Sequence, residues 1–168
     1  MTDSQIQFRG FPKIPRLENE SYTFTEKIDG TNAAIVITEY GDIFAQSRTR
    51  ILDETKLGDN YGFCKWVNGN KDELLKLGEG YHFGEWWGHG INRNYGLKDK
   101  RFSLFNIWHE TPPEIVHKVP VVGSDKDNAI FRLNTLGSIA APGFMNPEGI
   151  IMQSKQHHGV RYKIIISE

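Results

Sequence analysis

The chain has 168 residues and a formal net charge of −1 at pH 7, which suits one domain and is short for two. This near-neutral balance gives no overall basic field, so any site for a polyanion has to be local. The single cysteine, Cys64, excludes an internal disulfide and most cysteine metal sites, and no apolar run approaches the ~20 residues of a membrane span. We therefore expect one intracellular, cytoplasmic domain over residues 1–168, with no membrane association.

Short apolar segments separated by turn residues predict a protein rich in strands. Two prolines predict an extended segment at 11–17. The expected strands are 22–27, 33–38, 43–46, 81–86 and 102–108, followed by a closing hairpin of 149–153 and 160–166. Apolar side chains at helical spacing predict one helix within 60–77 and a short one near 127–136. Antiparallel strands with two helices indicate the α+β class.

The first segment with chemical character is Glu26-Lys27-Ile28-Asp29-Gly30-Thr31-Asn32, in which Lys27 ends a predicted strand. A lysine amine is protonated at pH 7, and it becomes a nucleophile when desolvation and neighbouring positive charge favour the neutral form. A strand end that feeds a glycine turn supplies a partly buried setting. The alternative is a solvated strand lysine beside an ordinary hairpin turn, and Lys-x-Asp-Gly alone does not decide between the two.

Two further segments suit the recognition of a nucleotide. Arg48 and Arg50 occupy alternate positions after the third strand, so in an extended chain they would point the same way and could clamp a phosphate or a sugar. Glu85 lies among apolar neighbours between two glycines, as a lone acceptor for ribose hydroxyls would. Each has a plain alternative, namely surface charge for the arginines and an exposed strand position for Glu85.

The last two segments lie in the second half of the chain. Phe105, in an aromatic strand, could stack on a purine or belong to the core. Glu148 precedes one strand of the closing hairpin, and Arg161 and Lys163 lie on the other. Hairpin pairing would bring the carboxylate near two cations that project to one side. That arrangement suits a metal and a phosphate, although a cross-strand salt bridge explains it equally well.

In their order along the chain, these five segments resemble the motifs of the covalent nucleotidyltransferase superfamily of ATP-dependent ligases and mRNA capping enzymes. The likeness is strongest to the RNA ligase 2 type, and it extends from Lys13-Ile14-Pro15-Arg16 through Lys163. It implies an antiparallel-sheet-rich, ATP-grasp-like ligase adenylation domain with a few helices.

The resemblance also implies roles for individual residues. Lys27 would carry AMP, Glu26 would help to read adenine, and Asn32 would assist sealing. The residues implied in binding the nucleotide or a metal are Arg48 for nucleotide and phosphate, Glu85 for ribose, Phe105 for adenine stacking, Glu148 with Asp29 for a hydrated metal, and Arg161 with Lys163 for phosphates. Arg161 departs from the usual lysine pair and keeps the charge without the compact ammonium geometry.

The activity implied is that of an ATP- and Mg²⁺-dependent RNA ligase that joins 5′-phosphate and 3′-hydroxyl ends of RNA or RNA/DNA. The chain ends soon after Lys163, so we expect no C-terminal accessory domain, and a partner protein could replace one. Binding of a polynucleotide would then depend on local cations. The candidates are Lys13, Arg16, Arg93, Lys98, Lys100 and Arg101.

Two alternatives share the motifs. One is a GTP-dependent, capping-type guanylyltransferase, which Thr31-Asn32 and the lead-in at residues 13–16 disfavour. The other is a non-catalytic nucleotide- or RNA-binding module of the same fold, which the retention of Lys27 disfavours.

Overall fold

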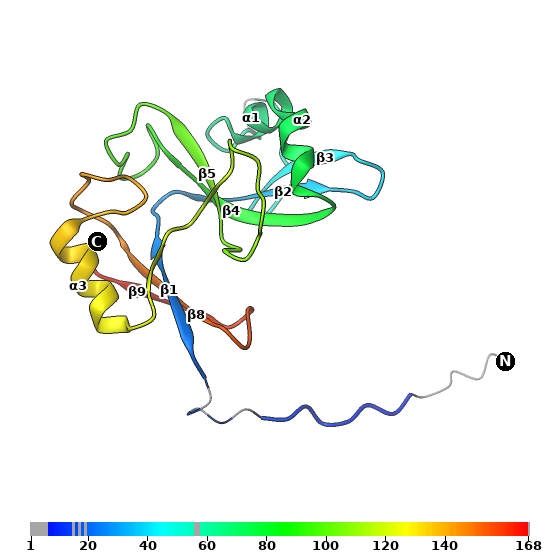
Figure 1. Cartoon of the computed structure of the whole chain (residues 1–168). Coiled ribbons are helices and arrows are strands. Elements are labelled where there is room, and N and C mark those ends of the chain that lie inside the picture. Colours follow the sequence, from blue (N-terminus) through cyan, green and yellow to red (C-terminus); the bar gives the residue numbers. More distant parts are fainter. Residues whose placement is uncertain (1–6, 15, 17, 19, 56–57, 168) are drawn as a thin grey trace.

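Two β-sheets form the framework of the protein (Figure 1). The computed structural model describes residues 7–14, 16, 18, 20–55 and 58–167. The four-stranded sheet has the order β7 (Val121–Gly123), β1 (Tyr22–Lys27), β8 (Gly149–Ser154) and β9 (Arg161–Ile165). The five-stranded sheet has the order β3 (Ile43–Ser47), β2 (Thr31–Ile37), β4 (Gly80–Gly88), β5 (Lys100–Leu104) and β6 (His117–Lys118). All strand pairs are antiparallel except β5–β6.

Helices cover one face of each sheet. The short helices α1 (Phe63–Gly69) and α2 (Lys71–Leu74), with a 3₁₀ turn at Leu75–Leu77, lie over the five-stranded sheet, and α3 (Lys126–Leu136) packs against the four-stranded sheet (Figure 1). These elements confirm the α+β class. No helix in the described part of the chain is long and apolar enough to cross a membrane.

Strand β2 shows how the sheet divides its side chains between a core and an open face. Ala33, Ile35 and Ile37 point into the core beneath α1, where Phe63, Trp86 and Phe102 also pack. Because successive residues of a strand alternate in direction, Asn32, Ala34 and Val36 lie on the opposite face. That second face is where the candidate site is built.

The predicted strands are confirmed with small differences in their bounds, but two expectations need correction. The helix expected within 60–77 is interrupted at Asn70, whose backbone angles of φ −129° and ψ 24° are not helical. The strand expected at 102–108 ends at Leu104, because Asn106 accepts from the Trp108 amide and turns the chain. The short strands β6 and β7 were not anticipated. Of the segment expected to be extended at 11–17, the described residues have no regular secondary structure, and residues 15 and 17 lie outside the described residues.

The segment Ile28–Gly30 carries the chain from one sheet to the other. Strands β1 and β2 belong to different sheets, so the hairpin turn considered for Asp29-Gly30 is wrong. Gly30 is required here by close approach, since a Cβ atom would lie 2.4 Å from the Trp86 carbonyl oxygen and 2.7 Å from Trp87 Cβ. The glycine therefore lets the crossing lie directly against strand β4.

Gly30→Ala should accordingly destabilise the protein. Overpacking of this kind costs about 1–3 kcal/mol, or more where backbone has to move, and here the nearest atom is a backbone oxygen. Gly69→Ala is the matched control, because a Cβ atom added there would meet nothing within 4 Å and alanine favours a helix. Urea unfolding of the two variants measures the difference, and equal midpoints would contradict the steric argument.

Candidate active site

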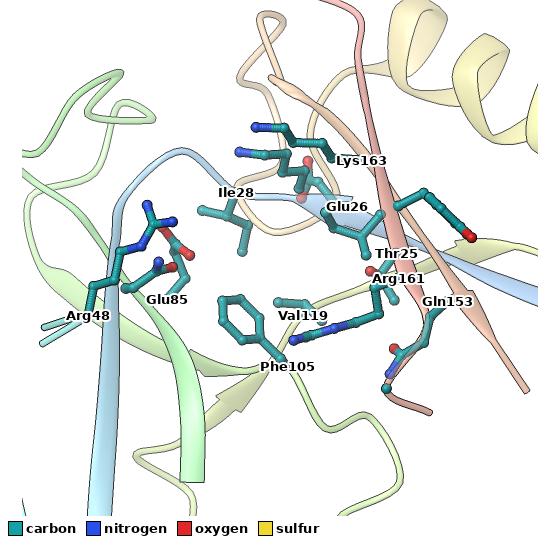
Figure 2. A pocket seen from close by; sticks show the side chains of 15 residues that line it. Thr25, Glu26, Ile28, Arg48, Glu85, Phe105, Val119, Gln153, Arg161 and Lys163 are labelled. Carbon is teal, nitrogen blue, oxygen red and sulfur yellow. The ribbon is translucent and has the colours of Figure 1, made fainter. Parts of the chain in front are cut away.

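A cavity of about 630 Å³ lies between the two sheets, at the point where the chain crosses from β1 to β2 (Figure 2). Its volume is within the range of small-molecule sites. Ten residues were predicted to form the site, and eight of them line this cavity: Glu26, Lys27, Asn32, Arg48, Glu85, Phe105, Arg161 and Lys163. Of the other two, Glu148 is hydrogen-bonded to Lys27 of the cavity, and Asp29 directly follows the lining residue Ile28 in the chain.

The amine of Lys27 forms an ion pair with Glu148, with 2.6 Å between Nζ and Oε2. Lys27 is the last residue of β1 and lies opposite Gly149, so strand pairing sets Glu148 beside it. Both side chains are partly buried, at 23% and 16% exposure. The hairpin pattern predicts Glu148 near Arg161 and Lys163, and among the ion pairs of the described residues its partner is Lys27.

Arg161 and Lys163 project to one side, as predicted. They lie opposite Gln153 and Ile151 of β8, and all four residues line the cavity. The Arg161 guanidinium carbon lies 5.6 Å from the centroid of the Phe105 ring, which is cation–π distance. Phe105 packs against the cluster of Ile28 and presents its ring to the cavity (Figure 2), so its stacking on a purine stays a prediction.

Glu26 is buried, and its carboxylate accepts from the amides of Ile139 and Ala140 at 3.2 and 2.9 Å. Burial raises the pKa of this carboxyl, while the hydrogen bonds from Ala140, Ser138 and Ile139 oppose the rise. The side chain therefore fixes the loop that follows α3 against β1. The role in reading adenine that the resemblance implied remains a prediction.

Asp29 is held by a loop that the sequence did not single out. Its carboxylate accepts from Arg93 Nε at 2.9 Å and from Asn92 Nδ2 at 2.8 Å, and its backbone amide donates to the Tyr95 hydroxyl at 2.7 Å. Burial raises the pKa of Tyr95 and keeps this phenol neutral. The loop after Glu85 is rich in asparagine and glycine, and positive φ values occur at Asn92, Asn94 and Tyr95. This composition was the sequence feature that could have indicated a structured loop here.

Arg93 corrects one expectation. It was a candidate cation for polynucleotide, but its side chain is only 13% exposed. Besides Asp29, it donates to the Asn146 carbonyl and to Ser167. Arg93 thus joins the crossing segment to the chain on both sides of β8 and β9, and its charge is engaged inside the protein.

Glu85 is buried at the floor of the cavity and accepts from the Gly30 amide at 3.2 Å. It lies opposite Asn32 in the pairing of β2 with β4. Burial raises the pKa of Glu85 to about 7, and the nearby charge of Lys27 limits the rise. Its carboxyl group therefore changes charge close to neutral pH.

The arginine segment is a tight turn and not an extended strand, because the Ser47 amide donates to the Arg50 carbonyl at 2.8 Å. Alternate positions consequently do not project in parallel, and Arg48 is the member of the pair that lines the cavity. Of the other candidate cations, Arg101 pairs with Asp99 at 3.0 Å, and Lys98 and Lys100 line a separate depression beside Trp66. Lys13 and Arg16 are exposed in the N-terminal segment.

Solved structures share this fold. A Naegleria gruberi RNA ligase variant with AMP and Mn matches with a TM-score of 0.62 and 20% identity over 88% of this chain and 50% of that chain. Another variant of that ligase, with ATP and Mn, matches with a TM-score of 0.62 and 19% identity over 87% and 49%. A third variant with ATP and Mn has a TM-score of 0.61 and 17% identity over 94% and 56%. No curated protein matches the chain significantly.

The chain thus shares the fold of the Naegleria gruberi RNA ligase structures. Residues 20–165 match the family model described as RNA ligase, so the chain belongs to the RNA ligase family. It spans about half the length of the first solved structures that it matches.

The pKa of Glu85 makes stability depend on pH. A carboxyl with a pKa of 4.5 in the unfolded chain and about 7 in the folded one binds more protons when folded, so stability falls as pH rises from 4.5 through 7. Glu85→Gln retains the acceptor for Gly30 and does not ionise. Its melting temperature should therefore rise relative to wild type by several degrees between pH 5 and 8.

The control for this measurement is Glu73→Gln, which removes an exposed carboxyl of α2 that pairs with Lys76 in the following 3₁₀ turn. Differential scanning fluorimetry at matched ionic strength should show no comparable pH trend for this variant. A constant difference between Glu85→Gln and wild type across pH 5–8 would contradict the raised pKa.

Proposed function

We propose that this chain is the adenylation domain of an ATP-dependent RNA ligase, with Lys27 as the nucleophile that carries AMP. The observation that carries the proposal is the Lys27 amine, ion-paired at 2.6 Å with Glu148 and presented to a cavity of about 630 Å³. Membership of the RNA ligase family supports it. Structures of the Naegleria gruberi ligase with ATP or AMP and Mn support the choice of nucleotide.

The cavity offers a partner for each part of ATP. The Phe105 ring can stack on the base, and the buried Glu85 carboxylate can accept from the ribose hydroxyls. Lys163 lies on β9 in the cavity wall, where its charge can neutralise phosphates. We infer that the α-phosphate faces Lys27, because the amine has to approach it in line with the leaving pyrophosphate.

Three nucleotidyl transfers follow from this placement. Lys27 Nζ forms a bond to the α-phosphorus as the bond to pyrophosphate breaks. The AMP then passes to a 5′-phosphate end, and a 3′-hydroxyl displaces AMP to form the phosphodiester. The Lys27 ammonium has to lose a proton before the first step, and Glu148 Oε2 is an acceptor at hydrogen-bond distance.

The residues that would hold a divalent cation such as Mg²⁺ are Glu148 and, indirectly, Asp29. In the described part of the chain no three acidic, histidine or cysteine side chains converge on one point, and the Asp29 carboxylate is engaged by Arg93 and Asn92. These residues therefore fit a hydrated ion that Glu148 would hold through water molecules, as proteins commonly hold Mg²⁺. Such an ion neutralises charge on the phosphates.

The nucleophile can be tested by intact mass after incubation with ATP and Mg²⁺. We expect wild type to gain one AMP, and Lys27→Ala and Lys27→Arg to gain none. Lys27→Arg is the matched control for folding, because it retains a cation for Glu148, whereas Lys27→Ala leaves that carboxylate unpaired and should melt lower. An AMP adduct on either variant would rule out Lys27. A GMP adduct formed from GTP alone would indicate a capping-type enzyme, and the absence of any adduct on wild type would indicate a binding module.

Separate steps can be assigned to separate residues. Asn32 and Arg48 lie on the β2–β3 side of the cavity, apart from Lys27 on β1. We expect Asn32→Ala and Arg48→Ala to slow the sealing of pre-adenylated RNA at least tenfold more than they slow formation of the lysyl-AMP adduct. Lys71→Ala, an exposed cation on α2, should change neither rate. Equal losses in both steps would show that Asn32 and Arg48 serve only ATP binding.

A further inference from the structure

The face of the five-stranded sheet that carries Asn32 and Glu85 continues beyond the cavity as a row of exposed aromatic side chains. Ala34 of β2 lies between Gln46 of β3 and Phe83 of β4. One step further out, Val36 lies between Phe44 and Tyr81. We call the face made by Phe44, Gln46, Ala34, Val36, Tyr81 and Phe83 the aromatic face.

Three rings on this face remain open to solvent. Phe44, Tyr81 and Phe83 are 45%, 64% and 52% exposed. The rings of Tyr81 and Phe83 are stacked, with centroids 6.1 Å apart and planes inclined by 17°. Single exposed aromatics are ordinary, but several on one sheet face indicate a binding surface.

Two depressions connect the aromatic face to the cavity. One, of about 260 Å³, has Ala34, Gln46 and Phe83 among its lining residues and shares Asn32 and Arg48 with the cavity. The other, of about 250 Å³, lies on the side of Tyr81 and Phe83 and shares Gln153 with the cavity. Phe105 and Arg161 line all three hollows. A polymer lying on the aromatic face would therefore lead directly to the reactive lysine.

The chemistry of the depressions favours a nucleic acid. No aspartate or glutamate lines either of them in the described part of the chain, although the chain has 21 acidic residues. Their charged groups are the guanidiniums of Arg48 and Arg161, and the Gln46 and Gln153 amides add hydrogen-bonding groups. Separate rings beside amides and guanidiniums match bases and phosphates, whereas a protein partner would favour a continuous apolar patch.

A stacked pair bounds the outer depression. The rings of Trp108 and His158 are parallel within 5°, with centroids 3.8 Å apart. This contact joins the segment after β5 to the β8–β9 turn, and both residues line the depression. The outer hollow is consequently walled by aromatic rings on two sides, Tyr81 and Phe83 on one and this pair on the other.

We propose that the aromatic face binds unpaired bases of the RNA strand whose end reacts at Lys27. The proposal rests on the proposed function and deepens it, because it names the substrate class. A base can enter the slot over Ala34, stack on Phe83 and place its phosphate at Arg48. Bases inside a duplex are already stacked and cannot use the rings, so single-stranded or frayed RNA ends are preferred to a fully paired nick.

The test compares binding of a 5′-phosphorylated, fluorescent single-stranded RNA octamer with binding of a blunt duplex of the same sequence. Fluorescence anisotropy should show at least a tenfold loss of single-strand affinity in Tyr81→Ala/Phe83→Ala, with little change for the duplex. Phe131→Ala, which removes an exposed ring on α3, is the matched control and should bind as wild type does. Tyr81→Leu/Phe83→Leu retains apolar area without stacking and should lose affinity as the alanine variant does.

The salt dependence of single-strand affinity is a second test of the proposal. If Arg48 and Arg161 supply the phosphate contacts, the log–log slope for the single strand should be about −1.4, from roughly −0.7 for each contact. A slope steeper than about −4 would overturn the proposal, since it would require a broad basic surface. Unchanged affinity in Tyr81→Ala/Phe83→Ala would also overturn it.

Two further measurements separate the outcomes. Lysyl-AMP formation, followed by intact mass, should be unchanged in Tyr81→Ala/Phe83→Ala, because neither ring lines the nucleotide cavity. Failure of wild type to form the adduct would contradict the proposed function, while the anisotropy result would still report on the aromatic face. Light scattering that showed a wild-type dimer dissociated by these substitutions would assign the face to a second copy of the chain and overturn the RNA proposal.

Discussion

The site depends on the chain passing from one sheet to the other within three residues, Ile28–Gly30. This crossing sets the end of β1, with Lys27, against the start of β2, with Asn32, so residues close in sequence lie on two walls of one cavity. It is fixed from several directions, because Arg93 and Tyr95 hold Asp29 and the Glu85 carboxylate holds the Gly30 amide. The lysine is therefore positioned by hydrogen bonds to its neighbours as well as by its own ion pair.

Three glutamates around the crossing are handled in three different ways, which follow from what surrounds each one. Glu26 accepts hydrogen bonds from two backbone amides. Glu85 accepts from one backbone amide and lies near the charge of Lys27. Glu148 forms an ion pair with the Lys27 amine. Burial raises the pKa of both Glu26 and Glu85. Glu85 can thus be neutral or charged near pH 7, whereas the amides around Glu26 make it a structural anchor.

Sequence patterns predicted the strands and most of the cavity wall because both depend on local order. Alternation identifies strands, and residues such as Lys27, Glu85 and Phe105 occur near their ends. The partners of Asp29 could not be predicted in the same way, since Arg93 is 64 positions away and its loop has no regular period. The hairpin considered as the alternative at Asp29-Gly30 is wrong, because a glycine turn and a glycine required by close packing look the same in sequence.

The two faces of strand β2 bear on how a chain of net charge −1 would bind the polyanion proposed as its substrate. Its inward residues form the core beneath α1, while the other face carries the exposed Asn32, the buried Ala34 and the half-buried Val36. Among the described residues that line the three hollows, the acidic ones are Glu26 and Glu85 of the cavity, where Glu85 is buried. Toward Tyr81 and Phe83 the lining changes to rings, amides and two guanidiniums. On the proposed RNA-binding role, attraction there would need no overall positive charge, because stacking would supply affinity and the few cations would fix where the phosphates lie.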